Sequence, residues 1–554
     1  MDNDMKKDTA ATLGRIDSQS QTDVVNGDDL RLAQLGHTQE LKRQFSLPAL
    51  GALCLCLMAT WEALSTVVAP ALVSGGAPCL FYNLSVEIGT GDSWRDHLGE
   101  SRKTNIVKSI ISTICTICIA SSLGEIASIY PTAGGQYHWV AALCPPSTRS
   151  AAAFTTGWIS VGGQVVLTSS AAFAAGLQTQ ALIILNDDSY IPQRWQGMLF
   201  YWAILVYGMV MNIWGHRLLP TANLLSGVLH VVGFLSILIV LGVMAPKNSA
   251  SFVFTEFVNS SGWESDGVSW LVGLISAVYP FLGYDAACHL AEEMPNASRN
   301  VPIAMVGSVV VNGIMGLVYG TVLLFCTGPL EALLSTPTGF PFMQIFMDVT
   351  KSYGGATFMS LMIILTAVAA TVAGITSTSR TLWAFARDKA TPYDHYLSKV
   401  NKRQQIPVHS VVLVTVLQML LGFIYLGNTT AFNAILSMAI IGMYLSYIIP
   451  IVYMLVHGRK NLSRSDFGPF KLGPVVGPIL NVISLIWMTV VIIFSTFPSA
   501  MPVTPQNMNY SIVVMAGWLT FGVVYYISFG RKKFEVPAVD NVVTGVSVHT
   551  EVVV

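Results

Sequence analysis

The chain has 554 residues, of which 53% are hydrophobic and 11% are charged, and its formal net charge is -1. Because a soluble globular protein carries about 25% charged residues, this composition excludes an ordinary soluble domain. The net charge argues neither for nor against nucleic acid as a partner, and the eight cysteines are scattered rather than spaced as a disulfide framework or a zinc site.

Residues 1–46 are polar, which predicts a disordered cytoplasmic tail rather than a signal peptide. Residues 47–529 hold apolar runs that are each long enough to cross a bilayer core of about 30 Å as a helix. Twelve spans are predicted, approximately at 47–73, 107–130, 153–185, 196–214, 219–244, 268–290, 302–326, 354–376, 409–426, 431–456, 476–497 and 510–529. Residues 530–554 form a second tail. Because each of the twelve apolar runs is predicted to be a helix, the predicted fold class is an all-α integral membrane protein.

The distribution of Lys and Arg predicts the orientation in the membrane. With the N-terminus inside, 22 of the 29 Lys and Arg residues fall on the inner side and 7 fall on the outer side. Because basic residues are enriched in cytoplasmic segments, both termini are expected to be cytoplasmic. Asn259, in the sequence Asn259-Ser260-Ser261, then faces outward as a candidate glycosylation site. We expect the plasma membrane as the location, with the vacuolar membrane as the alternative.

A polar stretch at 84–108 separates spans 1 and 2 and holds four of the seven outer charges. Joining the apolar flanks of this stretch would give one smooth hydrophobic segment. Two interpretations stay open: an insertion, such as non-coding sequence retained in the gene model, or a genuine outer loop. Sequencing the transcript distinguishes them.

Span 1 carries an acid near its middle, Glu62, beside Trp61 and Thr60. An ionised carboxylate in hydrocarbon is heavily penalised, so Glu62 must face a cavity, meet a cation or be protonated. A carboxylate next to an indole face suits an ammonium group. The alternative is a neutral Glu that is hydrogen-bonded between helices.

Span 6 combines Pro280, Gly283 and Asp285. Pro removes a backbone hydrogen bond and Gly weakens a helix, so the pattern predicts a break in this span. The exposed helix ends at such a break can attract carboxylates and cations. A packing kink without any ligand is the alternative.

Three other residues inside spans are candidates for the site. His230 in span 5 and Glu125 in span 2 can couple ion movement, or can be hydrogen-bonded structural residues. Trp158 in span 3, like Gln164 on the same span, can line a cavity or simply pack against other helices.

Four stretches resemble the amino acid–polyamine–organocation superfamily, and its fungal amino acid/choline transporter branch of GABA and choline permeases in particular. They are TWEALSTVVAPALVSGG (60–76), SLGEIASIYPTAGGQYHWVAAL (122–143), FLGYDAACHLAEEMPNASRNVP (281–302) and SRTLWAFARDKATP (379–392). The resemblance implies a LeuT-like fold, in which spans 1–5 and 6–10 form inverted repeats and two further helices are added.

The resemblance also implies where a substrate would bind, namely between broken spans 1 and 6. The residues carried over by position are Thr60, Trp61, Glu62, Leu282, Gly283, Tyr284 and Asp285. The proton gradient would drive transport without any cofactor, and His230 lies on the helix that often carries the coupling cation in this fold. Span 1 departs from the pattern because it lacks the paired glycines that mark the break in many members.

The sequence therefore predicts a secondary transporter for an amino acid or a small amine such as GABA or choline, which works by alternating access. Two alternatives stay open: a nutrient sensor with the same fold that does not transport, and a transporter of a secondary metabolite in either direction. An enzyme is the least favoured class, because no metal cluster or nucleophile–base spacing stands out.

Overall fold

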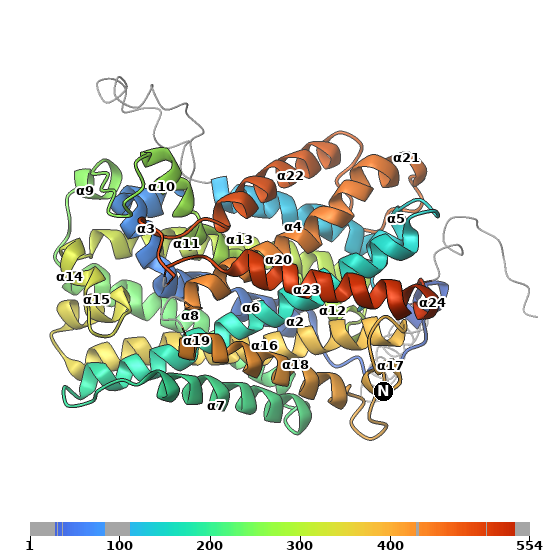
Figure 1. The fold of residues 1–554 in the computed structure, drawn as a ribbon, viewed down its shortest axis with the longest axis horizontal. Helices are drawn as coiled ribbons and strands as arrows, with labels where there is room; N and C mark the ends of the chain where they lie inside the picture. Colours follow the sequence, from blue (N-terminus) through green and yellow to red (C-terminus); the bar gives the residue numbers. More distant parts are fainter. Residues whose placement is uncertain are drawn as a thin grey trace, which may run out of the picture.

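The computed structural model describes residues 28–29, 31–35, 37–83, 111–427, 431–505 and 507–537. Within these ranges every regular element is helical, and twelve spans are long and apolar enough to cross a membrane. The long helices run along the horizontal axis of Figure 1. The predicted fold class and number of spans are confirmed, whereas the polar stretch at 84–108 lies outside the described residues.

Most spans are long helices, whereas spans 6 and 9 consist of shorter pieces, and further short helices lie at the two ends of the bundle. In chain order, the spans are built from α2 (Leu47–Met58), α3 (Thr60–Asn83), α4 (Ile111–Ile129), α6 (Arg149–Asn186), α7 (Arg194–Ile213), α8 (Leu219–Met244), α10 (Asp266–Val272), α11 (Ile275–Val278), α12 (Ala286–His289), α13 (Ala297–Phe325), α16 (Tyr353–Arg387), α18 (Val408–Leu421), α19 (Phe423–Gly427), α20 (Ala431–Tyr453), α22 (Val476–Ser495) and α23 (Ser511–Tyr525). The shorter helices are α5 (Gln136–Leu143), α9 (Ala250–Phe254), α14 (Leu330–Leu334), α15 (Pro341–Thr350), α17 (Asp394–Leu397), α21 (Arg459–Asn461) and α24 (Arg531–Lys533).

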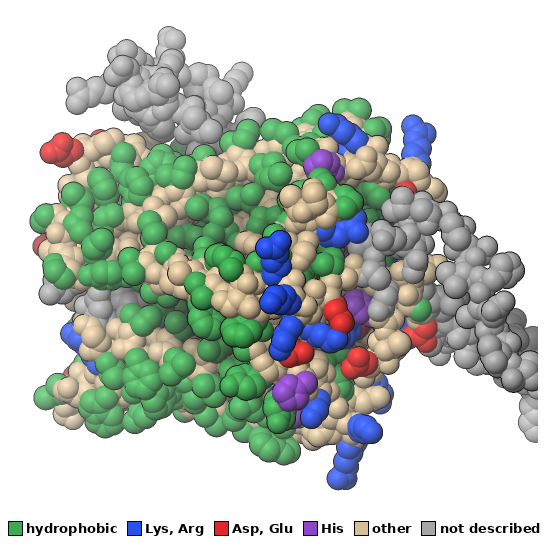
Figure 2. All heavy atoms as spheres, turned by 45° about the vertical axis from the view of Figure 1, so that its right-hand side comes forward, with side chains coloured by type: hydrophobic (Ala, Val, Ile, Leu, Met, Phe, Trp, Pro, Cys, Tyr) green, Lys and Arg blue, Asp and Glu red, His purple; other side chains and the backbone are tan. Residues whose placement is uncertain are grey.

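The two ends of the bundle differ in charge. One end, called here the termini end, carries residues 37–46 and 531–537 together with α5 and α17, whereas α9, α14 and α15 lie at the opposite, distal end (Figure 1). Figure 2 shows Lys and Arg side chains gathered on the side that carries the termini end, and hydrophobic side chains over much of the remaining visible face. This is the charge asymmetry that the Lys and Arg count predicts.

Local sequence explains where span 1 begins and why two spans are longer than predicted. The side chain of Ser46 accepts a hydrogen bond from the backbone N–H of Ala49, and a proline stands in the first turn of α2. Span 1 continues to Asn83 and span 8 to Arg387, about ten residues beyond the predicted ends. These extensions are rich in Gly, Ser and Thr, which hydropathy scores poorly, yet they are packed inside the protein. The extension of span 8 is a continuous helix, whereas that of span 1 is kinked at Gly76, which has φ 71°.

Helix α6 forms the axis of the bundle and packs against α5, α7, α16 and α20. Its small residues permit this close packing. A Cβ atom added at Gly163 would lie 2.8 Å from the backbone carbon of Gly442 in α20, so the two backbones touch at this crossing. Since the inside of a membrane offers no water to satisfy polar groups, the polar side chains of α6 bond to the helices packed beside it. The close packing fixes the positions of these side chains.

Candidate functional site

Span 1 is broken at Ala59, which separates α2 from α3. Ala59 adopts a left-handed conformation with φ 43°, which is unfavourable for a residue with a Cβ atom. The predicted break near Thr60, Trp61 and Glu62 is therefore displaced by one residue, and these three residues form the first turn of α3. The Thr60 hydroxyl donates a hydrogen bond of 2.8 Å to the carbonyl of Pro280, so the break is tied directly to span 6.

Span 6 is broken where the sequence predicts. After α11 and a short 3₁₀ turn, Leu282 is extended and Gly283 has φ 107°, and the chain becomes helical again at α12. Only glycine tolerates this backbone, and an added Cβ atom at Gly283 would lie 2.9 Å from Cγ of Leu57. Since Leu57 belongs to the last turn of α2, the two breaks face each other.

Glu62 and His230 form a buried pair next to the break in span 1. Glu62 Oε1 lies 2.8 Å from His230 Nδ1, and the two side chains are 2% and 0% exposed. Within the part of the chain that the structure describes, the second oxygen of Glu62, Oε2, and the second ring nitrogen of His230, Nε2, have no hydrogen-bond partner. The pair can therefore take up one more proton, or one cation, without losing a bond that it already makes.

Aromatic rings surround this pair. The ring centroid of Trp61 lies 5.2 Å from that of Tyr319, 5.9 Å from that of His230 and 6.2 Å from that of Phe234. The Ser65 hydroxyl donates to the Tyr319 oxygen at 2.6 Å, while the indole N–H of Trp61 has no partner. The sequence does not reveal Tyr319 or Phe234, because neither stands near a motif and both contacts are long-range.

Asp285 belongs to a second polar cluster. Its Oδ2 atom accepts a hydrogen bond of 2.9 Å from Gln136 Nε2 and one of 3.4 Å from Gln164 Nε2, and it lies 3.4 Å from His289 Nε2. The Tyr284 ring lies 5.6 Å from the ring of Tyr447 in α20. The spacing of Asp285 and His289, four residues apart, was a signal in the sequence that could have identified the histidine.

Two predicted site residues lie elsewhere. The rings of Trp158 and Trp518 stack at 4.8 Å, and each indole N–H donates to the backbone carbonyl of the other residue at 2.9 Å. Glu125 accepts hydrogen bonds from Arg459 at 2.6 Å and from the backbone N–H of Leu472 at 2.7 Å. The structure therefore gives Trp158 a packing contact with α23 and gives Glu125 a bond to the segment after α20, and neither joins the Glu62–His230 pair.

A belt of ion pairs joins the helices at the termini end. Arg387 donates two hydrogen bonds of 3.0 Å to Glu292, and Arg380 donates one of 2.8 Å to Glu293. Asp388 accepts a hydrogen bond of 2.8 Å from Tyr137, and burial raises the pKa of Asp388 to about 7. This belt, called here the arginine belt, holds spans 6 and 8 together next to the two tails.

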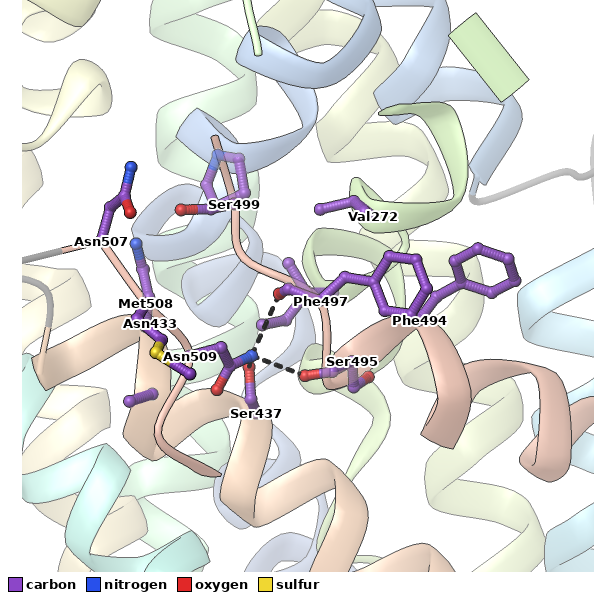
Figure 3. A pocket seen from close by; sticks show the side chains of 13 residues that line it. Val272, Asn433, Ser437, Phe494, Ser495, Phe497, Ser499, Asn507, Met508 and Asn509 are labelled. Atoms are coloured by element: carbon purple, nitrogen blue, oxygen red, sulfur yellow. Dashed lines mark hydrogen bonds between the residues drawn. The ribbon is translucent and has the colours of Figure 1, made fainter. Parts of the chain in front are cut away.

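A hollow opens toward the distal end. It is lined by Pro70 of span 1, Val272 and Ile275 of span 6, Asn433, Ala434 and Ser437 of α20, and Phe494, Ser495, Phe497, Ser499, Asn507, Met508 and Asn509. Figure 3 shows Asn509 bridging the carbonyls of Ser495 and Phe497, with hydrogen bonds of 2.8 and 3.1 Å. Pro70 follows the break in span 1 and Ile275 precedes the break in span 6, so the hollow lies on the distal side of both breaks, and its lining holds none of the candidate site residues.

Asn259, the candidate glycosylation site, is half-buried at the distal end. Its side-chain N–H₂ group donates 3.0 Å hydrogen bonds to the Trp263 carbonyl and to Asp266.

Within the described residues, no group of three His, Cys, Asp or Glu side chains could hold a metal ion.

Residues 64–518 match the family model described as Amino acid permease. The chain belongs to the amino acid permease family. This permease is 32% identical over 531 residues to an uncharacterised amino-acid permease of Schizosaccharomyces pombe, with 94% of this chain and 92% of that protein covered. It is 30% identical over 496 residues to the choline transporter of Saccharomyces cerevisiae, with coverages of 89% and 83%. It is 28% identical to the amino-acid permease BAT1 of Arabidopsis thaliana, with coverages of 95% and 99%.

The permease fold is also similar to that of solved transporters. Crystal structures of two mutants of a manganese transporter from Eremococcus coleocola match with a TM-score of 0.51 over 87% of this chain and 93% of that protein, at 11% sequence identity. This likeness shows the fold alone. The predicted family and the LeuT-like fold are confirmed, and membership of a transporter family confirms that the permease is not an enzyme.

Proposed function

We propose that this permease is a proton-coupled secondary transporter for an amino acid or a small amine, such as choline or GABA, which works by alternating access. The observation that carries the proposal is the buried Glu62–His230 pair beside two broken spans. Family membership supports the reaction class, and similarity to a choline transporter supports an organic cation among the substrates.

The charge of the pair supports both binding and coupling. When Glu62 is ionised and His230 carries a single proton on Nδ1, the pair is hydrogen-bonded and has a net charge of -1 in a buried place. A buried net charge is unfavourable unless it is compensated. A proton on His230 Nε2 and a substrate ammonium group near Glu62 Oε2 are two ways to compensate it, which links the proton to the substrate.

The breaks supply the remaining contacts of the proposed substrate site. Thr60 and Trp61 would flank the substrate from span 1, and the ring of Trp61 offers a face for an ammonium group. Backbone N–H groups in the first turn of α3 lack partners within the helix and would hold a substrate carboxylate. From span 6, the contributing residues would be Leu282, Gly283, Tyr284 and Asp285.

The membrane orientation is part of the proposal. The termini end would face the cytoplasm, because the Lys and Arg side chains gather there. The distal hollow would then be the outer approach, and the arginine belt would be the inner closure. The plasma membrane is the proposed location.

Uptake by purified permease in liposomes tests the function. Labelled choline, GABA and a set of amino acids are supplied at external pH 5.5 and 7.5, with a pH-sensitive dye trapped inside. We expect at least one substrate to enter faster at pH 5.5 and to acidify the interior. In Glu62→Gln, which keeps the size of the side chain, we expect uptake to fall at least tenfold and the substrate-dependent acidification to disappear.

Glu264→Gln is the matched control, because Glu264 is exposed at the distal end and the chemical change is the same. We expect this variant to transport like the wild type. Normal uptake and normal acidification by well-folded Glu62→Gln would contradict the assignment of Glu62.

A further inference from the structure

The cluster around Asp285 contains a histidine whose protonation decides which hydrogen bonds the cluster can make. We propose that His289, Asp285 and Gln164 form a proton-operated latch, which holds the termini side of the transport pathway closed while His289 is neutral and opens it when His289 is protonated. The proposal rests on the proposed function in one respect, since it treats the permease as an alternating-access transporter.

The contacts of His289 define its tautomer. Its Nδ1 atom lies 3.0 Å from the carbonyl of Ala133, and because a carbonyl can only accept, Nδ1 carries a proton. Its Nε2 atom lies 2.6 Å from the amide nitrogen of Gln164, which can only donate. The other end of the same amide, Oε1, accepts a hydrogen bond of 2.9 Å from Thr381. His289 is therefore neutral in this arrangement.

A proton added to Nε2 of His289 is incompatible with this arrangement. The imidazolium and the Gln164 amide would then place two donors 2.6 Å apart. The new N–H has a better acceptor within reach, because Asp285 Oδ2 lies only 3.4 Å from the same nitrogen. A hydrogen bond with an ionised donor or acceptor is roughly twice as strong as one between neutral groups. Asp285 Oδ2 already accepts from Gln136 at 2.9 Å and from Gln164 at 3.4 Å, so a charged donor on His289 displaces the longer of these two bonds. Protonation therefore favours a His289–Asp285 bond and removes both bonds of the Gln164 amide to span 6.

The exchange of partners has a mechanical consequence. Gln164 belongs to α6, which packs along α16 and α20, whereas α12, the half of span 6 beyond the break, packs on α2, α13 and α16. The Gln164 amide thus joins span 3 to span 6. The His289–Asp285 bond lies within span 6 alone, so it replaces a bond between spans by a bond within one span. The α12 segment is then free to move relative to α6.

A further contact extends the latch to the chain between spans 2 and 3. Gln136, at the start of α5, donates to Asp285 at 2.9 Å, and Ala133 accepts the other N–H of the histidine. Residues 133–136 are therefore expected to move when the hydrogen bonds of the cluster change. Because the arginine belt begins only three residues after His289, movement of α12 would be transmitted to the closure at the termini end.

The other titratable and charged groups around His289 are already committed or are weak acids. On α16, Arg380 and Arg387 are paired with Glu293 and Glu292. The remaining groups interact with Asp285, and they are Cys54 of α2, Tyr284, Cys288 of α12 and Tyr447 of α20. Of these neighbours, Asp285 is the carboxylate without an arginine partner, and it is the acceptor that the latch requires.

Cys288 offers a native reporter for the opening of this half of the pathway. It is adjacent to His289, is 1% exposed and has a free thiol. The purified permease is placed in nanodiscs, which leave both ends accessible. It is treated with a hydrophilic maleimide at several pH values between 5.5 and 8. Labelling of Cys288 is then quantified by peptide mass spectrometry. Each rate is divided by that of an exposed cysteine introduced by Ser465→Cys, which removes the effect of pH on thiol reactivity.

We expect normalised labelling of Cys288 in the wild type to be at least fivefold faster at pH 5.5 than at pH 8. His289→Gln cannot gain a charge, so its labelling should be slow and independent of pH. Gln164→Leu removes the amide, so its labelling should be fast at both pH values. Gln180→Leu is the matched control, because it makes the same change on the same helix in a buried residue that bonds to Tyr190 and Gln193 instead; it should behave like the wild type.

Labelling of the wild type that does not change with pH would overturn the latch, and so would an unchanged pH dependence in His289→Gln. If His289→Gln does not fold, Gln164→Leu decides, because a wild-type pH response in that variant contradicts the proposal. The readout needs neither substrate nor transport. Failure of the Glu62 uptake test therefore leaves the latch standing, and failure of the labelling test leaves the Glu62 site standing.

Discussion

Buried carboxylates are held by different partners at the termini end and at the two breaks. At the termini end, Glu125, Glu292 and Glu293 each pair with an arginine, at nitrogen–oxygen distances between 2.6 and 3.0 Å. At the breaks, Glu62 and Asp285 instead face histidines, at 2.8 and 3.4 Å. All five carboxylates are almost fully buried, so the difference lies in the partner and not in the exposure.

The choice of partner determines what each region can do. An arginine stays charged at every accessible pH, so its pair with a carboxylate is permanent and fixes one helix to another. A histidine can gain or lose its charge near neutral pH, so its pair has more than one stable state. The comparison predicts that the arginine belt supplies stability, whereas the histidine pairs supply response to protons.

Removal of an arginine from the belt should have the largest effect on stability. Arg387→Gln removes the two hydrogen bonds that Glu292 accepts from Arg387 and leaves the buried carboxylate with the one from the backbone N–H of Ala133. Such a broken buried pair costs about 3–5 kcal/mol. Arg387 also lies 4.5 Å above the ring of Trp383 and loses that contact. We expect a large drop in the thermal unfolding temperature, measured in detergent by size-exclusion chromatography after heating.

Lys389→Gln is the control for this prediction, because Lys389 pairs with Glu535 in an exposed place where an ion pair contributes little to stability. A drop for Lys389→Gln as large as that for Arg387→Gln would refute the distinction between the belt and ordinary surface pairs.

A smaller effect is expected at the break of span 6. Gly283→Ala places a side chain at φ 107° and within 2.9 Å of Leu57, and a backbone in such a region costs of order 1–3 kcal/mol. At the other break, Ala59→Gly relieves a left-handed alanine and should stabilise the permease by up to about 1 kcal/mol. Thermal unfolding of both variants checks the signs, and a stabilising Gly283→Ala would show that the break is not required in the folded state.

The sequence predicts the spans and one break well, for identifiable reasons. Hydropathy detects the twelve spans because lipid demands apolar runs, and Pro280 with Gly283 marks the break in span 6. The break at Ala59 carries no Gly or Pro. It is held by a contact with a residue 220 positions away, the hydrogen bond from Thr60 to the Pro280 carbonyl, which no local pattern reveals.

The same limit explains the mixed outcome for the site residues. An acid within a span is unusual enough to be noticed, so Glu62, Glu125 and Asp285 were all found. Which partner each acid meets depends on the packing of distant helices. Glu62 and Glu125 look alike in the sequence, since each is an acid within a span. In the structure Glu62 pairs with His230, whose charge can change, whereas Glu125 pairs with Arg459, whose charge is permanent.

The response of stability to acid depends on two histidines that have no acidic partner within the described residues. His37 and His138 lie at the termini end with ring centroids 5.8 Å apart. Three of their four ring nitrogens have no hydrogen-bond partner among the residues that the structure describes. Burial lowers the pKa of both to about 3. Because the unfolded chain binds protons below pH 6.5 and the folded chain does not, stability falls as the pH drops below 6.5. Between pH 7.5 and 5.5, the loss is about 1 kcal/mol for each histidine.

Thermal unfolding at these two pH values measures the effect. His138→Asn should reduce the pH dependence by about half, and His37→Asn combined with His138→Asn should nearly abolish this part of it. His395→Asn, a change at an exposed histidine, should leave the dependence unaltered. If the double variant loses as much stability at pH 5.5 as the wild type, the acid sensitivity arises elsewhere. An obvious place is then the histidines of the breaks, and the division between stabilising and responsive regions would have to be redrawn around them.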